Sequence, residues 1–428
     1  MKESWDAYCK YAWGYDFLGP QSQEGINWFG ASYTIIDSLD SLIIMGLDDE
    51  LRKARDWINS SLQLNSKVSL FETVVRCVGG LLTAYEQTGD KVFLDAAKKF
   101  GDSLLPAFNT QTGIPRVLIN LKTGESDDYS WCKESTILAD AGTCQIEFLD
   151  LSIHTGDPKY FNAAMKARNS LLLLGPVPPT MIDHDYLFPT REEYSFDAYG
   201  DSYFEYLIKL KYFSPSNETN QNEFNLAMQE GISRLGFTSR KTSLNYLARS
   251  VNGEMLHEIS HLSFFLPGTL YLASLIEHEY KELYLKLANE LLDTAVFLYN
   301  MQPTGLGGES ARFLSHYPNV IWYDDTYKLR PELVESLFYC WRVTHNVKAR
   351  IQAWKIFESI KKYCDTGSGY STVKDTSKQV VMYEDVQDSF FLSETLKYLY
   401  LIFCDDDTFS LDDYVFTTEA HPLKRVRS

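Results

Sequence analysis

Seven mostly apolar segments of the sequence each contain one ionisable side chain near their start. In "TIIDSLDSLIIMGL" it is Asp37, and in "LFETVVRCVGGLL" it is Glu72. The complete set is Asp37, Glu72, Asp140, Asp201, His261, Glu332 and Asp388. Burying a carboxylate is costly unless it is paired or holds a cation. Any one of them could be a helix cap or part of a core ion pair, but the whole set favours one shared site for acid–base chemistry.

Glu72 and Glu332 are the best placed of these residues for an acid and a base. Arg76 follows Glu72 at i+4, where it could orient the Glu72 carboxyl. Glu332 follows Pro331, which suits the first turn of a helix, so the helix N-terminus would keep Glu332 ionised as a base. Glycoside hydrolysis requires such a pair of carboxyl groups. Glu205 and Glu335 add further acidic groups about one turn beyond Asp201 and Glu332, and Glu394 follows Asp388 in the last segment.

Other reaction classes lack their motifs. No GxSxG, GxxxxGKS, HExxH or EF-hand loop is present, which argues against acyl transfer, phosphoryl transfer, zincin chemistry and standard calcium sensing. Three interpretations of the acidic set remain: glycoside hydrolysis, a site for a hard cation, or both.

The elements that must position these groups are predicted to be helical hairpins. An apolar helix, a polar turn and an amphipathic helix follow one another around Gly89–Asp90, Gly156–Asp157 and His345–Asn346. Weaker copies turn near Asp49, Asn217, His278 and Asp405. Most turns are about 60 to 70 residues apart, as expected for two helices with loops.

The hairpins predict an all-α fold with buried first helices and outer second helices. An open solenoid or a closed double ring would both satisfy this pattern. Each ionisable residue of the set lies about 11 to 18 residues before its turn, so all seven fall near one end of the inner helices. A closed ring that brings them to one acidic mouth is the most economical arrangement.

Composition limits the possible partners. The chain has 428 residues and a net charge of −18, which makes nucleic acid and anionic membranes poor partners. No apolar run approaches the roughly 18 residues of a membrane span, and the N-terminus has no apolar core of a signal peptide. Seven scattered cysteines without a CxxC pair argue against a zinc site and against a dense disulfide framework, although one or two bridges remain possible.

The C-terminal stretch "TTEAHP", residues 417–422, carries a hydroxyl, a carboxylate and an imidazole. Hard cations prefer oxygen ligands, and a threonine offers both its hydroxyl and its carbonyl oxygen. If this tail folds back into the ring, Thr418 could hold a Ca²⁺ ion whose bound waters face the carboxylates. Without the acidic set, an ordinary loop would be the better interpretation.

Seven blocks of the sequence, in order, resemble the class I α-1,2-mannosidases, glycoside hydrolase family 47. They are "NWFGASYTIIDSLDSLIIMGL", "LFETVVRCVGGLLTAY", "GDSYFEYLIK", "HLSFFLPGTL", "RPELVESLFY", "SFFLSETLKYLYLIF" and "YVFTTEAHP". The resemblance extends from Trp5 to Pro422 and implies one catalytic domain over residues 1–428. It also implies an (α/α)7 barrel with the C-terminal tail inside it, a Ca²⁺ ion and an inverting mechanism. The implied reaction removes terminal α-1,2-linked mannose from high-mannose N-glycans.

The resemblance also implies roles for individual residues. Glu72 would be the acid, acting through a water, and Asp201 is a rival acid or an essential partner. Glu332 would be the base for the water that the Ca²⁺ ion holds, and Thr418 would be a direct ligand of the ion. Phe390 would form an aromatic floor under the bound mannose. The positions that match the rest of the substrate pocket are Asp37, Arg76, Asp140, Tyr199, Glu205, His261, Glu309, Arg330, Glu335, Glu394 and Glu419.

The chain departs from the family pattern at three places. Asp140 replaces the usual Glu, so a pocket contact would lengthen or gain a water. Tyr199 stands where the endoplasmic-reticulum enzymes typically carry Arg, at a position that contacts the oligosaccharide, so branch preference does not carry over. The usual disulfide positions correspond to Phe264 and Ala295, so the bridge would be absent as a unit.

Two alternatives to the enzyme are a mannose-glycan-binding quality-control protein with weak or no hydrolysis, and a helical-repeat scaffold. The first predicts loss of a key carboxylate or of Thr418, and none is lost. The second leaves the aligned carboxylates unexplained. The leading hypothesis is therefore a monomeric processing enzyme whose partner is the N-glycan of a glycoprotein. Its substrate places it in the lumen of the endoplasmic reticulum or Golgi, while the chain shows no targeting signal and no N-terminal anchor.

Overall fold

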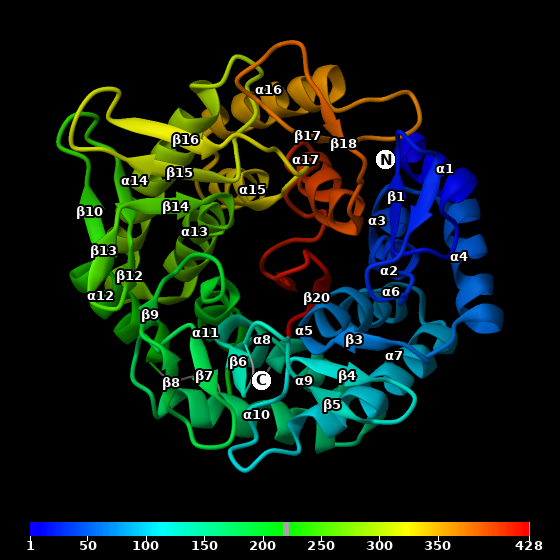
Figure 1. Cartoon of the computed structure of the whole chain (residues 1–428). Coiled ribbons are helices and arrows are strands. Elements are labelled where there is room, and N and C mark those ends of the chain that lie inside the picture. Colours follow the sequence, from blue (N-terminus) through cyan, green and yellow to red (C-terminus); the bar gives the residue numbers. More distant parts are fainter. Residues whose placement is uncertain (133, 217–221, 428) are drawn as a thin grey trace.

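The helices form two concentric rings around a central C-terminal tail (Figure 1). The structure, a computed structural model, describes residues 1–132, 134–216 and 222–427. The inner ring has seven positions within these ranges, several of them built from consecutive short helices. They are α2 (Tyr33–Asp37) with α3 (Leu39–Ile44); α5 (Leu70–Glu72) with η1 (Thr73–Val78) and α6 (Gly79–Thr88); α8 (Leu138–Gly142) with α9 (Gln145–Thr155); α11 (Asp201–Phe213); η3 (His261–Phe265) with α13 (Leu266–Ile276); α15 (Glu332–Thr344); and η5 (Phe391–Thr395) with α17 (Leu396–Leu401).

The outer ring consists of amphipathic helices whose apolar faces pack on the inner ring. They are α1 (Lys2–Tyr11), α4 (Asp48–Ser61), α7 (Lys91–Leu104), α10 (Lys159–Leu172), α12 (Glu223–Leu235), α14 (Lys281–Asn300) and α16 (Val347–Tyr363). The predicted turns separate inner from outer helices. At the turn around Gly89–Asp90, Gly89 ends α6 in the left-handed region (φ +70°). The Asp90 side chain then accepts a hydrogen bond from the Val92 amide at 3.0 Å and so begins α7. The predicted turn near Asn217 lies outside the described residues.

The seventh pair differs from the prediction. No helix follows Leu401 in the described part of the chain, because the segment around Asp405 is rich in Asp, Ser and Thr and lacks an apolar stripe. The N-terminal α1 supplies the remaining outer position instead. Its Glu3 pairs with Lys361 of α16 at 2.8 Å, and its Lys2 pairs with Glu50 of α4. The sequence pattern missed this because the two helices of that pair come from opposite ends of the chain.

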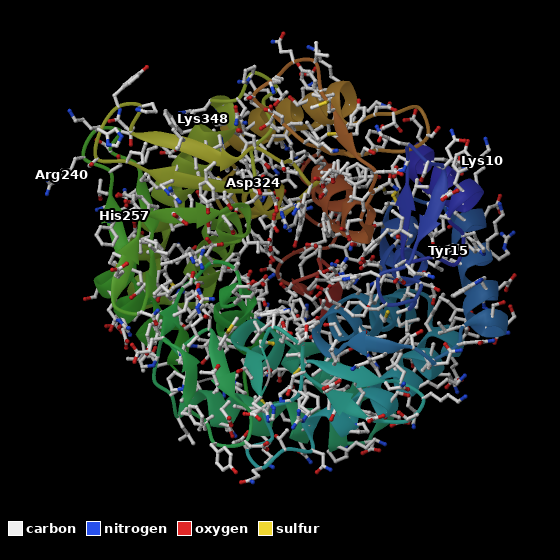
Figure 2. The ribbon with its side chains drawn as sticks, viewed as in Figure 1. Lys10, Tyr15, Arg240, His257, Asp324 and Lys348 are labelled. Carbon is white, nitrogen blue, oxygen red and sulfur yellow. The ribbon has the colours of Figure 1, made fainter. Side chains whose placement is uncertain are left out.

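The ring is closed, which excludes the open solenoid. The Ser41 hydroxyl of α3 donates to the carbonyl oxygen of Leu392 in η5 at 2.9 Å, so the first and last inner positions are neighbours. Side chains fill the space between the rings, and the labelled Lys10, Arg240 and Lys348 lie at the periphery (Figure 2). The fold is therefore the predicted (α/α)7 barrel.

Short antiparallel strands cover one end of the barrel. They pair as β1 (Phe17–Gly19) with β2 (Glu24–Ile26); β3 (Lys67–Ser69) with β4 (Leu118–Asn120) and β5 (Ser126–Asp127); β6 (Ser135–Ile137) with β7 (Met181–Asp183) and β8 (Pro189–Arg191); β9 (Glu193–Tyr194) with β12 (Arg249–Val251) and β13 (Glu254–Leu256); β10 (Gly236–Thr238) with β11 (Asn245–Leu247); β14 (Glu258–Ser260) with β15 (Ser310–Phe313) and β16 (Val320–Asp324); and β17 (Thr372–Val373) with β18 (Tyr383–Glu384). Three of them, β3, β6 and β14, lead directly into α5, α8 and η3. The N-terminal ends of the inner helices therefore lie under these strands.

The C-terminal tail lies inside the barrel, as the prediction required. Strands β19 (Tyr414–Phe416) and β20 (Pro422–Lys424) form a hairpin whose tip, residues 417–421, reaches the barrel centre (Figure 1). Two fully buried lysines hold this tip. Lys209 of α11 donates to the carbonyl oxygen of Thr417 at 3.3 Å, and Lys397 of α17 donates to that of Ala420 at 2.8 Å.

The tail packs so closely on α6 that only glycine is accommodated there. A Cβ atom on Gly79 would lie 2.8 Å from the His421 ring, and one on Gly80 would lie 2.7 Å from the carbonyl oxygen of Ile36. Neither distance is compatible with a side chain on α6. The Gly-Gly pair inside an otherwise apolar helix is thus explained by the approach of two other chain segments.

All seven cysteines are free, and Phe264 and Ala295 are both buried in the core. Apolar packing holds the core at these two positions, where the family pattern has a disulfide. No helix in the described ranges has the length and apolar character needed to cross a membrane.

Candidate active site

A pocket of about 550 Å³ opens at the strand-covered end of the barrel. Its lining is strongly acidic. Among the described residues, the carboxylates that line it are Glu72, Asp140, Asp201, Glu205, Glu332, Glu335, Glu394 and Glu419. Arg76, Tyr199, Arg330, Phe390 and Thr418 also line it. The pocket therefore brings together most of the residues that the sequence singled out.

Four of those residues lie behind the pocket wall. Asp37, His261, Glu309 and Asp388 do not line the pocket, but each contacts a residue that does. Asp37 and Asp388 face Arg76 at 3.5 and 3.9 Å, His261 binds Glu332 at 2.6 Å, and Glu309 binds Arg330 at 2.6 Å. Their direct partners are protein side chains, so they orient the lining residues.

Arg76 connects the acidic groups on one side of the pocket. Its Nε donates to Glu72 Oε2 at 2.6 Å, and its Nη1 lies 3.0 Å from Glu419 Oε1 and donates to the Ser389 hydroxyl at 2.6 Å. Burial would lower the pKa of Arg76, but the charges of Glu419, Glu72 and Asp37 outweigh burial and raise it well above its usual range. Arg76 lies in η1, a single π-helical turn, a feature that is frequent at functional sites.

Glu332 is held from behind by a chain of hydrogen bonds. It is the first residue of α15, directly after Pro331. Its Oε2 accepts a hydrogen bond from Nδ1 of His261 at 2.6 Å, and Nε2 of His261 pairs with the hydroxyl of Tyr299. With the proton on Nδ1, the imidazole donates to Glu332 and accepts from Tyr299, and Glu332 Oε1 lies 3.8 Å from Nη1 of Arg330, which also lines the pocket. This arrangement suits an ionised carboxylate that accepts a proton from a nucleophile.

Arg330 and Phe390 form another wall of the pocket. Both oxygens of Glu309 accept from the Arg330 guanidinium, at 2.6 and 2.8 Å. The guanidinium carbons of Arg76 and Arg330 lie 5.6 and 5.9 Å from the centre of the Phe390 ring. An aromatic ring between two fixed cations offers an apolar surface with hydrogen-bond donors at its margin.

Asp140 and Asp201 have no cation beside them in the described ranges. Burial, and then the charges of Glu72 and Asp201, raise the pKa of Asp140 well above its usual range. Burial, supported by the charges of Asp197, Glu205 and Glu332, raises the pKa of Asp201 to about 7. Asp201 is therefore partly protonated at neutral pH, as a general acid must be.

A second acidic group surrounds the tip of the tail. Burial raises the pKa of Glu335 despite the charge of Lys209, and it raises the pKa of Glu419 well above its usual range despite Arg76. Burial, and then the charge of Glu419, does the same for Glu394. Among the described residues, the charges that act most strongly on Glu394 all come from other carboxylates. Ionised together, these carboxyl groups would carry more negative charge than the protein's own cations balance.

Thr418 and these carboxylates fit a hard cation. The Thr418 amide donates to the hydroxyl of Tyr206 at 3.3 Å. Its hydroxyl and carbonyl oxygens have no hydrogen-bond partner among the described residues. The available donors are all oxygens, which Ca²⁺ prefers to nitrogen or sulfur, and a divalent cation would offset the excess negative charge.

Lys209 and Lys397 are among the functional residues that sequence analysis missed. Both are fully buried, and they pair with Glu205 of α11 and Asp40 of α3, respectively. The signal was present in the sequence, because each lysine interrupts an apolar run, in "FEYLIKL" and "SETLKYLYLIF". Interruptions by cations need the same explanation as interruptions by carboxylates.

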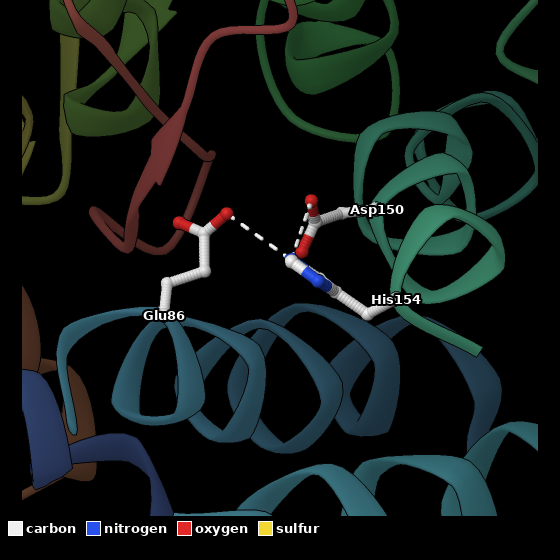
Figure 3. Close-up of side chains that lie close together, drawn as sticks. All are labelled: Glu86, Asp150 and His154. Atoms are coloured by element: carbon white, nitrogen blue, oxygen red, sulfur yellow. Dashed lines mark hydrogen bonds and ion pairs between the residues drawn. The ribbon is translucent and has the colours of Figure 1, made fainter. Parts of the chain in front are cut away.

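A separate cluster of Glu86, Asp150 and His154 lies at the C-terminal ends of α6 and α9, away from the pocket (Figure 3). The His154 Nε2 lies 3.2 Å from Glu86 and 3.4 Å from Asp150. The hydrogen bonds that its ring donates to Asp150 and Glu86 raise the pKa of His154 to about 10. The imidazolium thus supplies the positive charge between them. Glu86 also accepts from the Lys424 amide at 2.8 Å and so anchors β20.

Comparison with known proteins gives consistent results. The model of glycosyl hydrolase family 47 matches residues 1–425. Mannosyl-oligosaccharide 1,2-alpha-mannosidase MNS1 of Arabidopsis thaliana is 41% identical over 438 residues, covering 100% of this chain and 77% of that protein. Mannosyl-oligosaccharide 1,2-alpha-mannosidase IB of Mus musculus is 38% identical over 443 residues, covering 100% and 69%. The solved structure of an alpha-1,2-mannosidase from Trichoderma reesei superimposes with a TM-score of 0.92 at 26% identity, covering 99% of this chain and 97% of that one.

Proposed function

Because the chain belongs to glycosyl hydrolase family 47, we propose that it is a Ca²⁺-dependent, inverting α-1,2-mannosidase that trims terminal mannose from high-mannose N-glycans. One observation carries the proposal: a single pocket holds a carboxylate positioned as a base and two carboxyl groups suited to the acid role. Inverting glycoside hydrolysis needs one group of each kind on opposite sides of the sugar.

Glu332 is the proposed base. The N-terminus of α15 and the hydrogen bond from His261 both favour its ionised form. One oxygen is occupied by His261, so the other takes the proton from the attacking water. His261 and Tyr299 act as positioning residues, because they fix the orientation of Glu332 without lining the pocket.

The acid is either Glu72 or Asp201. Glu72 is oriented by Arg76, whose Nε donates to its Oε2 at 2.6 Å. For Glu72 to deliver a proton, a water must connect it to the leaving oxygen. Asp201 has no cation partner in the described ranges, and its pKa of about 7 keeps a proton available at neutral pH. The electrostatics therefore favour Asp201 as the immediate proton reservoir and Glu72 as its partner.

Thr418, with the acidic groups near the tail, is the proposed Ca²⁺ site. When bound, the ion supplies positive charge that orients oxygen ligands and favours ionisation of the attacking water. The chain itself contributes the neutral oxygens of Thr418 and the surrounding carboxylates Glu335, Glu394 and Glu419. Lys209 and Lys397 hold the tail so that Thr418 keeps its place.

The terminal mannose is proposed to bind over Phe390. The ring gives an apolar face to the sugar, and the carboxylates and two arginines around it accept and donate hydrogen bonds to hydroxyl groups. The remaining pocket positions, Asp140, Tyr199 and Glu205, are proposed substrate contacts.

We place the reaction in the lumen of the secretory pathway, where high-mannose glycoproteins are processed, and propose that the whole chain acts as one monomeric catalytic domain.

Incubation with a nine-mannose glycan, with and without EDTA and followed by mass spectrometry, tests the proposal. The expected result is stepwise loss of hexose that stops on chelation and resumes when Ca²⁺ is added. Proton NMR of the first product formed should show the β-anomer of mannose, as inversion requires. A folded protein that removes no hexose under any condition would contradict the proposal and favour a glycan-binding protein.

The acid can be assigned with α-mannosyl fluoride, whose leaving group needs no protonation. A variant that lacks the general acid should retain activity on the fluoride and lose it on the glycan. We expect this pattern for Asp201→Asn, and a loss on both substrates for Glu332→Gln. The same pattern in Glu72→Gln, with Asp201→Asn inactive on both substrates, would reverse the assignment.

A further inference from the structure

Four aromatic side chains surround the mouth of the acidic pocket, and we call them the rim aromatics: Trp28, Tyr129, Trp131 and Tyr199. Trp131 is 55% exposed, Trp28 49% and Tyr199 37%, whereas Phe390 deeper in the pocket is 8% exposed. Large aromatic side chains are usually mostly buried. Exposed rings on the lining of a single pocket therefore need an explanation.

Three of the rim aromatics form one continuous surface. The rings of Tyr129 and Trp131 stack nearly in parallel, with centres 5.6 Å apart and 12° between their planes. Tyr199 continues from Trp131 with a centre distance of 5.9 Å. These residues come from two chain segments, the loop after β5 and the turn before α11. The surface is thus formed by tertiary structure.

Two of the rim aromatics, Tyr199 and Trp28, lie on backbone segments that the structure holds in place. Tyr199 has φ +72°, a left-handed conformation that costs energy for a non-glycine residue, and its carbonyl oxygen accepts from the Ala139 amide at 2.9 Å. The loop of Trp28 is tied to the fully buried carboxylate of Asp16, which accepts from the amides of Trp28 and Phe29 at 2.9 and 2.8 Å. Rings fixed in advance lose little entropy when a ligand binds.

We propose that the rim aromatics form a stacking platform for part of the leaving group of the glycan. The mannose rings that stack there are those that follow the first mannose on the leaving-group side of the scissile bond. This inference rests on the proposed mannosidase function. The C–H groups on one face of a pyranose are apolar and bury well on an aromatic ring, while its hydroxyl groups stay in water. The gradient of exposure supports this order: the reacting sugar lies at the buried carboxylates, and the rest of the chain must leave through the mouth, where the rings are exposed.

The occupant is a glycan and not a protein surface. The rings line the same pocket as Glu332 and Asp201, so any ligand on them is continuous with the substrate in that pocket. The rest of the lining includes eight carboxyl groups and two arginines, and an apolar protein partner would leave those charges buried without partners. Trp131 is the central ring of the platform, because it contacts both Tyr129 and Tyr199.

The test compares Trp131→Ala with wild type on a nine-mannose glycan and on α-1,2-mannobiose, which is too short to reach the platform. The expected result is a KM about three- to tenfold higher for the long glycan, with kcat and the mannobiose parameters unchanged. Trp131→Phe should restore most of the loss because it keeps a stacking face. Trp354→Ala is the matched control, since Trp354 is 49% exposed on α16 outside the pocket.

Binding provides a second measurement that needs no turnover. Tryptophan fluorescence gives the Kd of the nine-mannose glycan for Glu332→Gln and for the double variant Glu332→Gln with Trp131→Ala. The Kd of the double variant should be higher by the same factor as the KM. An unchanged KM and Kd for the long glycan, or an equal loss on both substrates, would overturn the platform. If wild type cleaves neither substrate, the mannosidase proposal fails, and the Kd comparison still decides whether Trp131 binds the glycan.

Discussion

The guanidinium of Arg76 lies 3.0 Å from the carboxylate of Glu419, which joins the second inner position of the barrel to the C-terminal tail inside it. The same guanidinium binds Glu72 at 2.6 Å. A proposed acid and the tip of the tail are thus fixed by one cation. This shared cation explains why the end of the chain belongs to the active site.

Replacing the proposed base should abolish turnover and leave the fold intact. Glu332→Gln keeps the shape of the side chain but cannot accept a proton, so we expect kcat on the nine-mannose glycan to fall by about 10²- to 10⁴-fold. The exposed Glu358→Gln on α16 serves as the control for a loss of one negative charge. Normal hydrolysis by Glu332→Gln would remove Glu332 from the base role.

The stability of the metal-free protein should fall as the pH rises from about 4 to 7. The pKa of Asp201 is about 7 in the folded protein and near 3.8 when unfolded, so over this interval only the folded state keeps the proton. Because the folded state binds more protons there, its stability decreases with pH and levels off above about 7. Melting temperatures in EDTA should show this decline, and Asp201→Asn should make it shallower, while other buried carboxyls with raised pKa values, such as Glu335, retain the rest. An identical decline in wild type and Asp201→Asn would assign the effect to other groups.

Thr418 should be required for stabilisation by calcium. A ligand that binds only the folded state stabilises it by about 2.7 kcal/mol at 100 times its Kd, so Ca²⁺ should raise the melting temperature of wild type. We expect Thr418→Ala to lose most of this increment. Thr417→Ala is the neighbouring control, because the Thr417 hydroxyl accepts from the His421 amide at 3.1 Å. That variant should be less stable at baseline but keep the calcium increment. An equal increment in wild type and Thr418→Ala would contradict the assignment.

Loss of the buried cation beneath the tail should destabilise the barrel. Lys397 donates to Asp40 at 2.6 Å and to the carbonyl oxygen of Ala420 at 2.8 Å, and all of these groups are buried. Removing one partner of a buried pair leaves the other uncompensated, so Lys397→Met should cost about 3–5 kcal/mol in urea unfolding.

A double variant separates the ion pair from general packing. Asp40→Asn combined with Lys397→Met removes both charges of this pair, and His421 keeps Asp37 at 3.2 Å, so the double variant should be less destabilised than the sum of the two single changes. Strict additivity, or wild-type stability for Lys397→Met alone, would show that the pair does not hold the tail.

Much of the fold could be predicted from the sequence because helical hairpins are local. Periodicity and turn residues specify an inner and an outer helix wherever both lie within one segment, as they do around Gly89 and Gly156. The pairing of α1 with the last inner position could not be predicted in this way, since its contacts to Lys361 and Glu50 join residues far apart in the chain.

The candidate site likewise has features that the sequence determines and features that only the tertiary structure decides. The sequence by itself determined that carboxylates recur at one level of the inner helices, because a charge inside an apolar run is visible without a structure. Only the tertiary structure decided which of them have a cation, such as Glu72 beside Arg76, and which, such as Asp201, have none. It also brought Thr418 and the rim aromatics to the pocket. The reason is physical: burial and spacing along a helix are local properties, whereas charge pairing, pKa and ring stacking depend on distances between segments that meet only when the ring closes.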